Sequence, residues 1–200
     1  MIKSHKIAYD AAKANLSKAE VGLTLSMTDW YCEEGAEEQL KFIEHHMEDI
    51  YLNEVAGNDF FGVQTYTRTK INSQKLIVEE PELRQTSFFV YWPEVMDVVL
   101  PKAAKLAGVP LYITENGIST KDDNERIEFE TEVLNKVHAQ IESGLDIRGY
   151  FYWSLFDNFE WTDGFGPTFG LFEVDRSNFE RIPKKSAYWY KDVIKNNCID

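Results

Sequence analysis

The sequence predicts an α/β fold in which parallel strands alternate with helices. Four apolar, strand-like segments are separated from one another by segments with helical periodicity. No low-complexity tract, Pro/Ser-rich linker or obvious repeat divides the 200 residues, so they fit one domain. Strands that alternate with helices in this way form parallel sheets with right-handed crossovers.

The four strand-like segments are short apolar runs that end in polar or aromatic side chains. They comprise residues 21–31, 58–68, 109–117 and 147–156. Gly62 in the second segment allows close approach of a neighbouring chain. In the last segment, the two-residue alternation of a strand predicts that Phe151 and Leu155 point inward to the core.

Helical periodicity occurs between and after these strands. The predicted helices cover residues 2–19, 36–52, 92–108, 124–144 and 181–196. Pro93 is tolerated in a first turn, whereas Pro101 is expected to interrupt or kink the third helix. The polar segment 69–87, rich in Glu, Gln and Ser, predicts a loop.

The composition argues against partners that carry negative charge. The formal net charge is −13, and no basic run or nucleic-acid motif is present. Because phosphate backbones and anionic lipids bind basic patches, we expect neither nucleic acid nor membrane as a partner. The N-terminal residues lack the apolar core of a signal peptide, which predicts a cytoplasmic location.

The sequence predicts neither a cofactor nor a metal. No Gly-rich phosphate-binding loop follows any predicted strand, so the usual dinucleotide fingerprint is missing. Cys32 and Cys198 form no CxxC pair and have no nearby His at ligand spacing, which argues against a zinc site.

Two closures of the sheet fit this alternation: an open doubly wound sheet, or part of an eight-stranded barrel. Functional-looking side chains follow consecutive strands, among them Asp29, Tyr66, Glu115 and Trp153. Side chains at the C-terminal ends of strands are what the active site of a (β/α)₈ barrel needs. Four strands cannot close such a barrel, which takes about 250 residues, so half of it would be missing.

Glu115 ends an apolar strand in the stretch LYITENG, residues 111–117. Two roles are open for its carboxylate: capping a helix or meeting a cation, and catalysis. Retaining glycosidases place a nucleophilic carboxylate about 5 Å from a second, protonated carboxyl group. The segment 149–170 favours catalysis, because its aromatic rings suit the C–H faces of sugars and its acids suit sugar hydroxyls.

Several motifs resemble the C-terminal signature of glycoside hydrolase family 1, the β-glucosidase family. They are YITENG at 112–117, YWSLFDNFEW at 152–161, FGLFEVD at 169–175 and RIPKKSAYWYKDVI at 181–194. DFFGVQTYTR, DDNERI and GLDIRGY match as well, so the resemblance covers essentially the whole chain. It implies one partial (β/α)₈-barrel domain over residues 1–200, the C-terminal half with strands 5–8 and without strands 1–4.

The resemblance also implies a retaining β-glucosidase-like hydrolase and gives catalytic roles to two residues. Glu115 matches the family's nucleophile, and Tyr66 matches the tyrosine that hydrogen-bonds and orients that nucleophile. The residues implied to contact the sugar are Trp153 beneath the ring, Glu160 at hydroxyls 4 and 6, Trp161 beside it, Phe169 near C6, and Gln64 in place of the usual Asn. A carboxylate at position 160 repels phosphate, so unphosphorylated β-glycosides are the implied substrates.

The family's general acid/base is the Glu of a T(F/L)NEP motif, which this sequence does not contain. YLNEVAG at 51–57 is no substitute, because Val55 follows Glu54 and the segment does not end a strand. We therefore expect little or no activity from the isolated chain. Met1 is then either an internal residue of a longer enzyme or a true start.

A half barrel leaves strand edges and apolar layers uncovered. We therefore expect the chain to associate with a complementary N-terminal half-barrel or with itself. The alternative to an enzyme is a non-catalytic half-barrel that binds carbohydrate or assembles with another protein.

Overall fold

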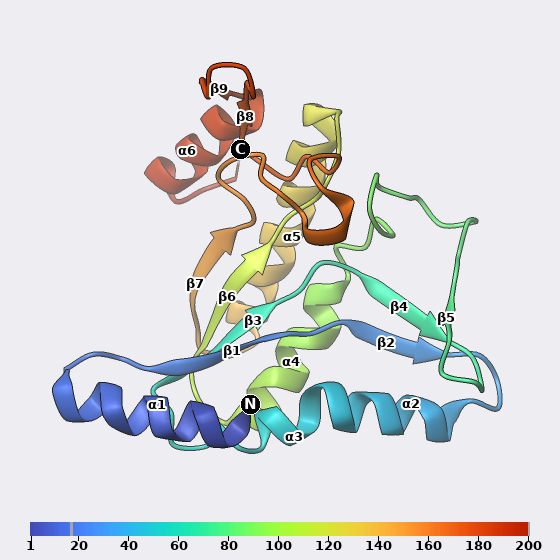
Figure 1. The fold of residues 1–200 in the computed structure, drawn as a ribbon, viewed down its shortest axis with the longest axis vertical. Helices are drawn as coiled ribbons and strands as arrows, with labels where there is room; N and C mark the ends of the chain where they lie inside the picture. The colour runs from blue at the N-terminus through green and yellow to red at the C-terminus, as the bar shows by residue number, and fades with distance from the viewer. Residues whose placement is uncertain (17, 200) are drawn as a thin grey trace.

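A four-stranded parallel sheet lies at the centre of the computed structural model, which describes residues 1–16 and 18–199 (Figure 1). The strand order is β1 (Gly22–Ser26), β3 (Phe60–Gln64), β6 (Leu111–Asn116) and β7 (Ile147–Tyr152). All pairings between these neighbours are parallel. The predicted α/β fold with a parallel sheet is confirmed, and the C-terminal ends of the four strands meet at one edge.

The α-helices among the described residues are α1 (Ile2–Asn15), α2 (Glu37–Glu44), α3 (Ile50–Leu52), α4 (Val95–Ala107), α5 (Asp123–Glu142) and α6 (Lys185–Asn196). A π-helical turn, His45–Asp49, joins α2 to α3. Pro101 lies inside α4 without interrupting it, because neighbours such as Leu100 and Ala103 are fully buried and hold the helix in place. None of the described helices is long and apolar enough to cross a membrane.

The hydrophobic core lies between the sheet and helices α4 and α5, which lie on one side of it (Figure 1). Alternate residues of β3 and β6 face these helices; Phe61, Val63, Leu111 and Ile113 are at most 1% exposed. The helix residues in this core include Val95, Met96, Val99, Leu100, Phe129 and Val133. Burial of such a side chain contributes about 1.5–3 kcal/mol, which holds the strands in register.

The other face of the sheet is lined by small side chains and exposed rings. The hydroxyls of Thr24 and Thr114 lie 2.8 Å apart, and a Cβ at Gly62 would come within 2.9 Å of both side chains. Gly62 therefore permits the close approach predicted from the sequence. The prediction that Phe151 and Leu155 point into the core is wrong: they are 56% and 53% exposed. Phe151 projects away from α5, since its neighbour Tyr150 faces that helix.

Two smaller sheets extend the molecule beyond the central one. Strands β2 (Asp29–Cys32), β4 (Arg68–Ile71) and β5 (Ile77–Val78) form the first. Strands β8 (Phe172–Val174) and β9 (Arg181–Pro183) form an antiparallel pair. The segment 21–31 thus holds two strands instead of one, and the predicted loop at 69–87 contains strand residues. The last helix starts later than predicted because residues 181–183 pair with β8.

Candidate active site

The carboxylate of Glu115 is held by side chains from the neighbouring strand. Gln64 ends β3, and its Nε2 donates to Glu115 Oε1 at 2.6 Å. Tyr66 lies two residues further on, and its hydroxyl donates to Glu115 Oε2 at 2.5 Å. The backbone repeats this link, since the amide of Thr65 donates to the Glu115 carbonyl at 3.0 Å. Both carboxylate oxygens are therefore fixed at the C-terminal edge of the sheet.

The surroundings of Tyr66 keep its hydroxyl protonated and therefore a hydrogen-bond donor. Burial raises the pKa of its hydroxyl above the usual value, and the hydrogen bond to the Glu115 carboxylate raises it further. The phenol thus keeps its proton across the physiological range and cannot become an anion beside Glu115. This pairing matches the orienting role that the family resemblance implies for Tyr66.

The structure argues against the capping role that the sequence left open for Glu115. The helix that follows, α5, is capped by Asp122, whose side chain accepts from the Asn124 amide at 3.0 Å. Glu115 instead lies near the end of β6, seven residues before the N-cap Asp122. Its oxygens face Gln64 and Tyr66 and leave further lone pairs for a substrate.

Trp153 and Glu160 lie together at the same edge of the sheet. Trp153 follows β7, and its indole Nε1 donates to Glu160 Oε1 at 3.3 Å. The Trp153 amide also donates to the carbonyl of Asn116 at 2.7 Å, which ties it to the strand of Glu115. Space is tight here, because a Cβ on Gly117 would lie 1.9 Å from the Trp153 carbonyl oxygen. Only glycine at this position lets the two segments meet.

Phe169 is buried among aromatic rings next to Tyr66. Its ring centroid lies 6.1 Å from that of Tyr66 and 5.7 Å and 6.0 Å from those of Phe88 and Phe89. The sequence did not single out these last two rings, although two consecutive Phe residues after a polar segment were an available signal. Trp161, another predicted sugar contact, is not buried in this way, since it is 85% exposed.

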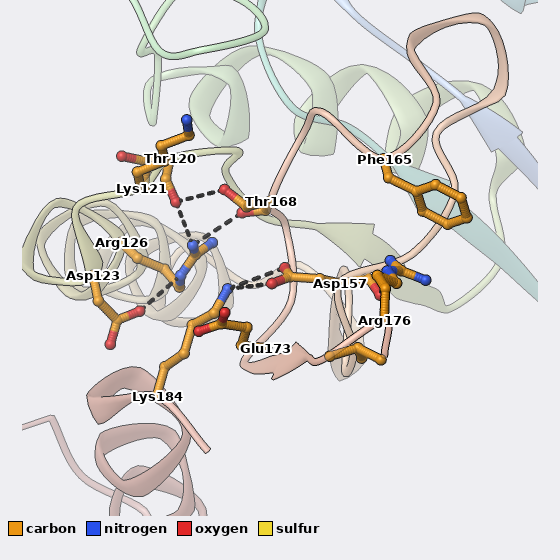
Figure 2. A pocket seen from close by; sticks show the side chains of 11 residues that line it. Thr120, Lys121, Asp123, Arg126, Asp157, Phe165, Thr168, Glu173, Arg176 and Lys184 are labelled. Carbon is orange, nitrogen blue, oxygen red and sulfur yellow. Dashed lines mark hydrogen bonds and ion pairs between the residues drawn. The ribbon is translucent and has the colours of Figure 1, made fainter. Parts of the chain in front are cut away.

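A buried arginine outside the predicted set ties two loops behind this edge. Arg126 of α5 donates to the carbonyls of Ile118 and Thr120 after β6, and to those of Thr168 and Phe169. Figure 2 shows its guanidinium beside the ion pair that Lys184 forms with Asp157 in a neighbouring pocket. Arg126 therefore fixes the backbone that carries Phe169.

Neither a metal cluster nor the discounted Glu54 contributes to the site. Among residues 1–16 and 18–199, no three His, Cys, Asp or Glu side chains converge in a way that could hold a metal ion. Glu54 follows α3, and its exposed side chain pairs with Lys6 of α1. Glu54 does not lie at the C-terminal end of a strand. The sequence excludes it as the general acid/base for the same reason.

A family model for glycosyl hydrolase family 1 matches residues 32–199. The chain belongs to glycosyl hydrolase family 1. β-Glucosidase A of Thermotoga maritima is 31% identical over 181 residues, which cover 80% of this chain and 41% of that protein. A 6-phospho-β-galactosidase of Staphylococcus aureus is 44% identical over 99 residues, covering 44% of this chain and 21% of that protein.

Solved structures of family 1 glycosidases share the fold over the length of this family 1 chain. The β-glycosidase BGL167 superimposes with a TM-score of 0.92 and 34% identity, over 98% of this chain and 48% of that one. Such neighbours are (β/α)₈-barrel β-glycosidases. The chain spans about half the length of the proteins and structures that it matches.

Proposed function

We propose that this chain supplies the nucleophile and part of the sugar site of a retaining β-glycoside hydrolase. The observation that carries the proposal is the Glu115 carboxylate, fixed by donors from Gln64 and Tyr66. One Glu115 oxygen attacks the anomeric carbon while the glycosidic oxygen leaves with a proton from a second carboxyl group. A water molecule then gives a proton to the second group, now a carboxylate, and its oxygen attacks the anomeric carbon, which breaks the glycosyl–enzyme ester and restores the Glu115 carboxylate.

The sugar lies, in this proposal, over the side chains gathered around Glu115. The Trp153 ring stacks beneath the sugar, and the Glu160 carboxylate accepts hydrogen bonds from its hydroxyls. Phe169 borders C6, Trp161 adds a ring from the exposed side, and Gln64 contacts both nucleophile and sugar. The indole–carboxylate contact between Trp153 and Glu160 supports these roles because it holds a stacking face and an acceptor together.

Unphosphorylated β-glycosides are the proposed substrates. A phosphate on the sugar would meet the Glu160 carboxylate, and like charges at contact repel each other strongly in a poorly solvated site. Glu160 is 9% exposed, so water would screen that repulsion weakly. The similarity to the 6-phospho-β-galactosidase covers only part of the chain, and the proposed preference depends on the side chain at position 160.

We further propose that residues 1–200 form a single partial domain equivalent to strands 5–8 of the barrel. The four parallel strands and the half-length match to barrel structures support this. The exposed face around Phe151 and the outer edges of β1 and β7 would then pair with a complementary half-barrel or with a second copy. A cytoplasmic location remains a proposal from the sequence.

Hydrolysis of an aryl β-glucoside tests the proposal, with the chain alone and mixed with a segment carrying strands 1–4 of a family member. We expect weak or no turnover by the chain alone, because general acid catalysis contributes about 10²- to 10⁴-fold. The mixture should turn over, and Glu115→Gln should abolish that activity while Glu142→Gln retains it. Sugar binding without turnover in the mixture would instead indicate the non-catalytic alternative.

A further inference from the structure

Glu130 is a completely buried acid that the site described above does not use. It lies on α5, is 1% exposed, and its Oε1 has no hydrogen-bond partner in the described structure. No Lys, Arg or His among the described residues forms an ion pair with it. An ionised carboxylate without a cation or a full set of donors is costly in such surroundings.

The contact between Glu130 and Tyr150 limits which protonation state of the carboxyl group fits. The Tyr150 oxygen lies 2.6 Å from Glu130 Oε2 and 2.7 Å from Asn116 Oδ1. The amide of Asn116 has a fixed orientation, because its Nδ2 donates to the carbonyl of Thr65 at 2.7 Å. Its Oδ1, which can only accept, therefore faces Tyr150.

The phenol of Tyr150 has one proton for two short contacts. That proton is needed for Asn116 Oδ1, which has none of its own to give. The remaining contact, between the Tyr150 oxygen and Glu130 Oε2, is a hydrogen bond only if the carboxyl group supplies the proton. We propose that Glu130 is a neutral carboxylic acid that donates to Tyr150 and, through it, positions Asn116 beside Glu115.

The groups that face Glu130 provide no ion pair that would stabilise its ionised form. Tyr150 and Tyr152 face it from β7, Tyr190 from α6, and Arg126 from its own helix. Arg126 directs its hydrogen bonds to backbone carbonyls, Asp123 and Tyr152 instead of Glu130. Burial raises the pKa of Glu130 to about 8 and outweighs the Arg126 charge, which acts in the opposite direction.

The resulting chain of hydrogen bonds crosses three strands next to the candidate nucleophile. It runs from Glu130 on α5 through Tyr150 on β7 and Asn116 on β6 to the Thr65 carbonyl after β3. Asn116 is adjacent to Glu115 in the chain, and Thr65 is adjacent to Tyr66. Glu130 is thus a positioning residue, and only this link to catalysis rests on the proposed function.

Infrared spectroscopy of the full chain in D₂O tests the protonation state without any sugar. At about pH 6 the wild type should show the carbonyl stretch of a buried protonated carboxyl group, and Glu130→Gln should remove it. Glu142→Gln, an exposed change on the same helix, should leave the band unchanged. A wild-type spectrum that Glu130→Gln does not alter would overturn the proposal.

Nuclear magnetic resonance of the ¹⁵N-labelled chain tests the positioning of Asn116. The side-chain amide signals of Asn116 should shift as the pH rises through about 8 in the wild type. In Glu130→Gln, whose amide is a permanently neutral donor to Tyr150, these signals should not titrate there. Absence of the shift in the wild type, or its persistence in Glu130→Gln, would refute the positioning role, whatever the sugar assays show.

Discussion

Replacement of Arg126 by leucine should destabilise the chain strongly. Arg126 is 1% exposed, and the Ile118 and Thr168 carbonyls accept hydrogen bonds from its guanidinium at 2.6 and 3.0 Å. In the described residues these two carbonyls have no other backbone or side-chain donor. A buried acceptor that loses its partner costs about 1–3 kcal/mol, so two of them cost roughly 2–6 kcal/mol.

The other partners of Arg126 soften the loss without removing it. The Thr120 carbonyl keeps the Thr168 hydroxyl at 2.9 Å, and the Phe169 carbonyl keeps the Tyr152 hydroxyl at 2.8 Å. Asp123 keeps two donors from Ser186, each at 2.7 Å. The expected loss therefore stays near that of the two orphaned carbonyls, a large part of a typical total stability of about 5–15 kcal/mol.

Urea denaturation followed by circular dichroism measures this loss. The midpoint for Arg126→Leu should fall well below that of the wild type with a similar m-value. Arg148→Leu is the matched control, since Arg148 pairs with Asp146 at the surface and its side chain is 43% exposed. If Arg126→Leu unfolds at the same urea concentration as Arg148→Leu, the buried guanidinium does not hold the two loops together.

Two further substitutions test the geometry of the candidate site. Gly117→Ala should disrupt the junction between β6 and Trp153, because the new Cβ would lie 1.9 Å from the Trp153 carbonyl oxygen. Thermal unfolding should show a clear drop in Tm for this variant. The control Gly166→Ala should show no such drop, because the nearest atom to its new Cβ would be 3.4 Å away. Tyr66→Phe should leave the number of tyrosines ionised at about pH 11 unchanged in an ultraviolet titration, since burial and the Glu115 carboxylate raise the pKa of Tyr66 above its ordinary value. One ionised tyrosine fewer in the variant would mean that Tyr66 is not held by Glu115.

The sequence was sufficient for the main sheet and for the residues around Glu115. Apolar runs alternating with helical periodicity predicted four parallel strands, and parallel strands bring their C-terminal ends together at one edge of the sheet. That topology is why Gln64 and Tyr66, about fifty residues before Glu115, contact its carboxylate. The family motifs pointed to the same residues independently.

The features that were missed depend on contacts between distant segments. The chain leaves the main sheet after β1 because the Thr28 amide donates to Glu48 of the π-helical turn at 3.0 Å. Segment 58–68 was predicted as one strand, but Arg68 begins a separate strand, β4, where its guanidinium stacks on the rings of Tyr31 and Trp92. From the helical pattern alone, Glu130 is expected at the surface of an amphipathic helix. Its contact with Tyr150, on a distant strand, cannot be predicted from that pattern. Local patterns carry no information on such partners.

Covalent trapping tests the central claim, that Glu115 is a glycosidase nucleophile, most directly. A 2-deoxy-2-fluoro β-glucoside with a strongly activated leaving group needs little acid assistance and slows release of the glycosyl–enzyme. We predict that peptide mass spectrometry locates the added sugar on Glu115, with the chain alone or mixed with a segment carrying strands 1–4, and that Glu115→Gln gives no adduct. An adduct on another carboxylate, or none in either sample, would contradict the assignment.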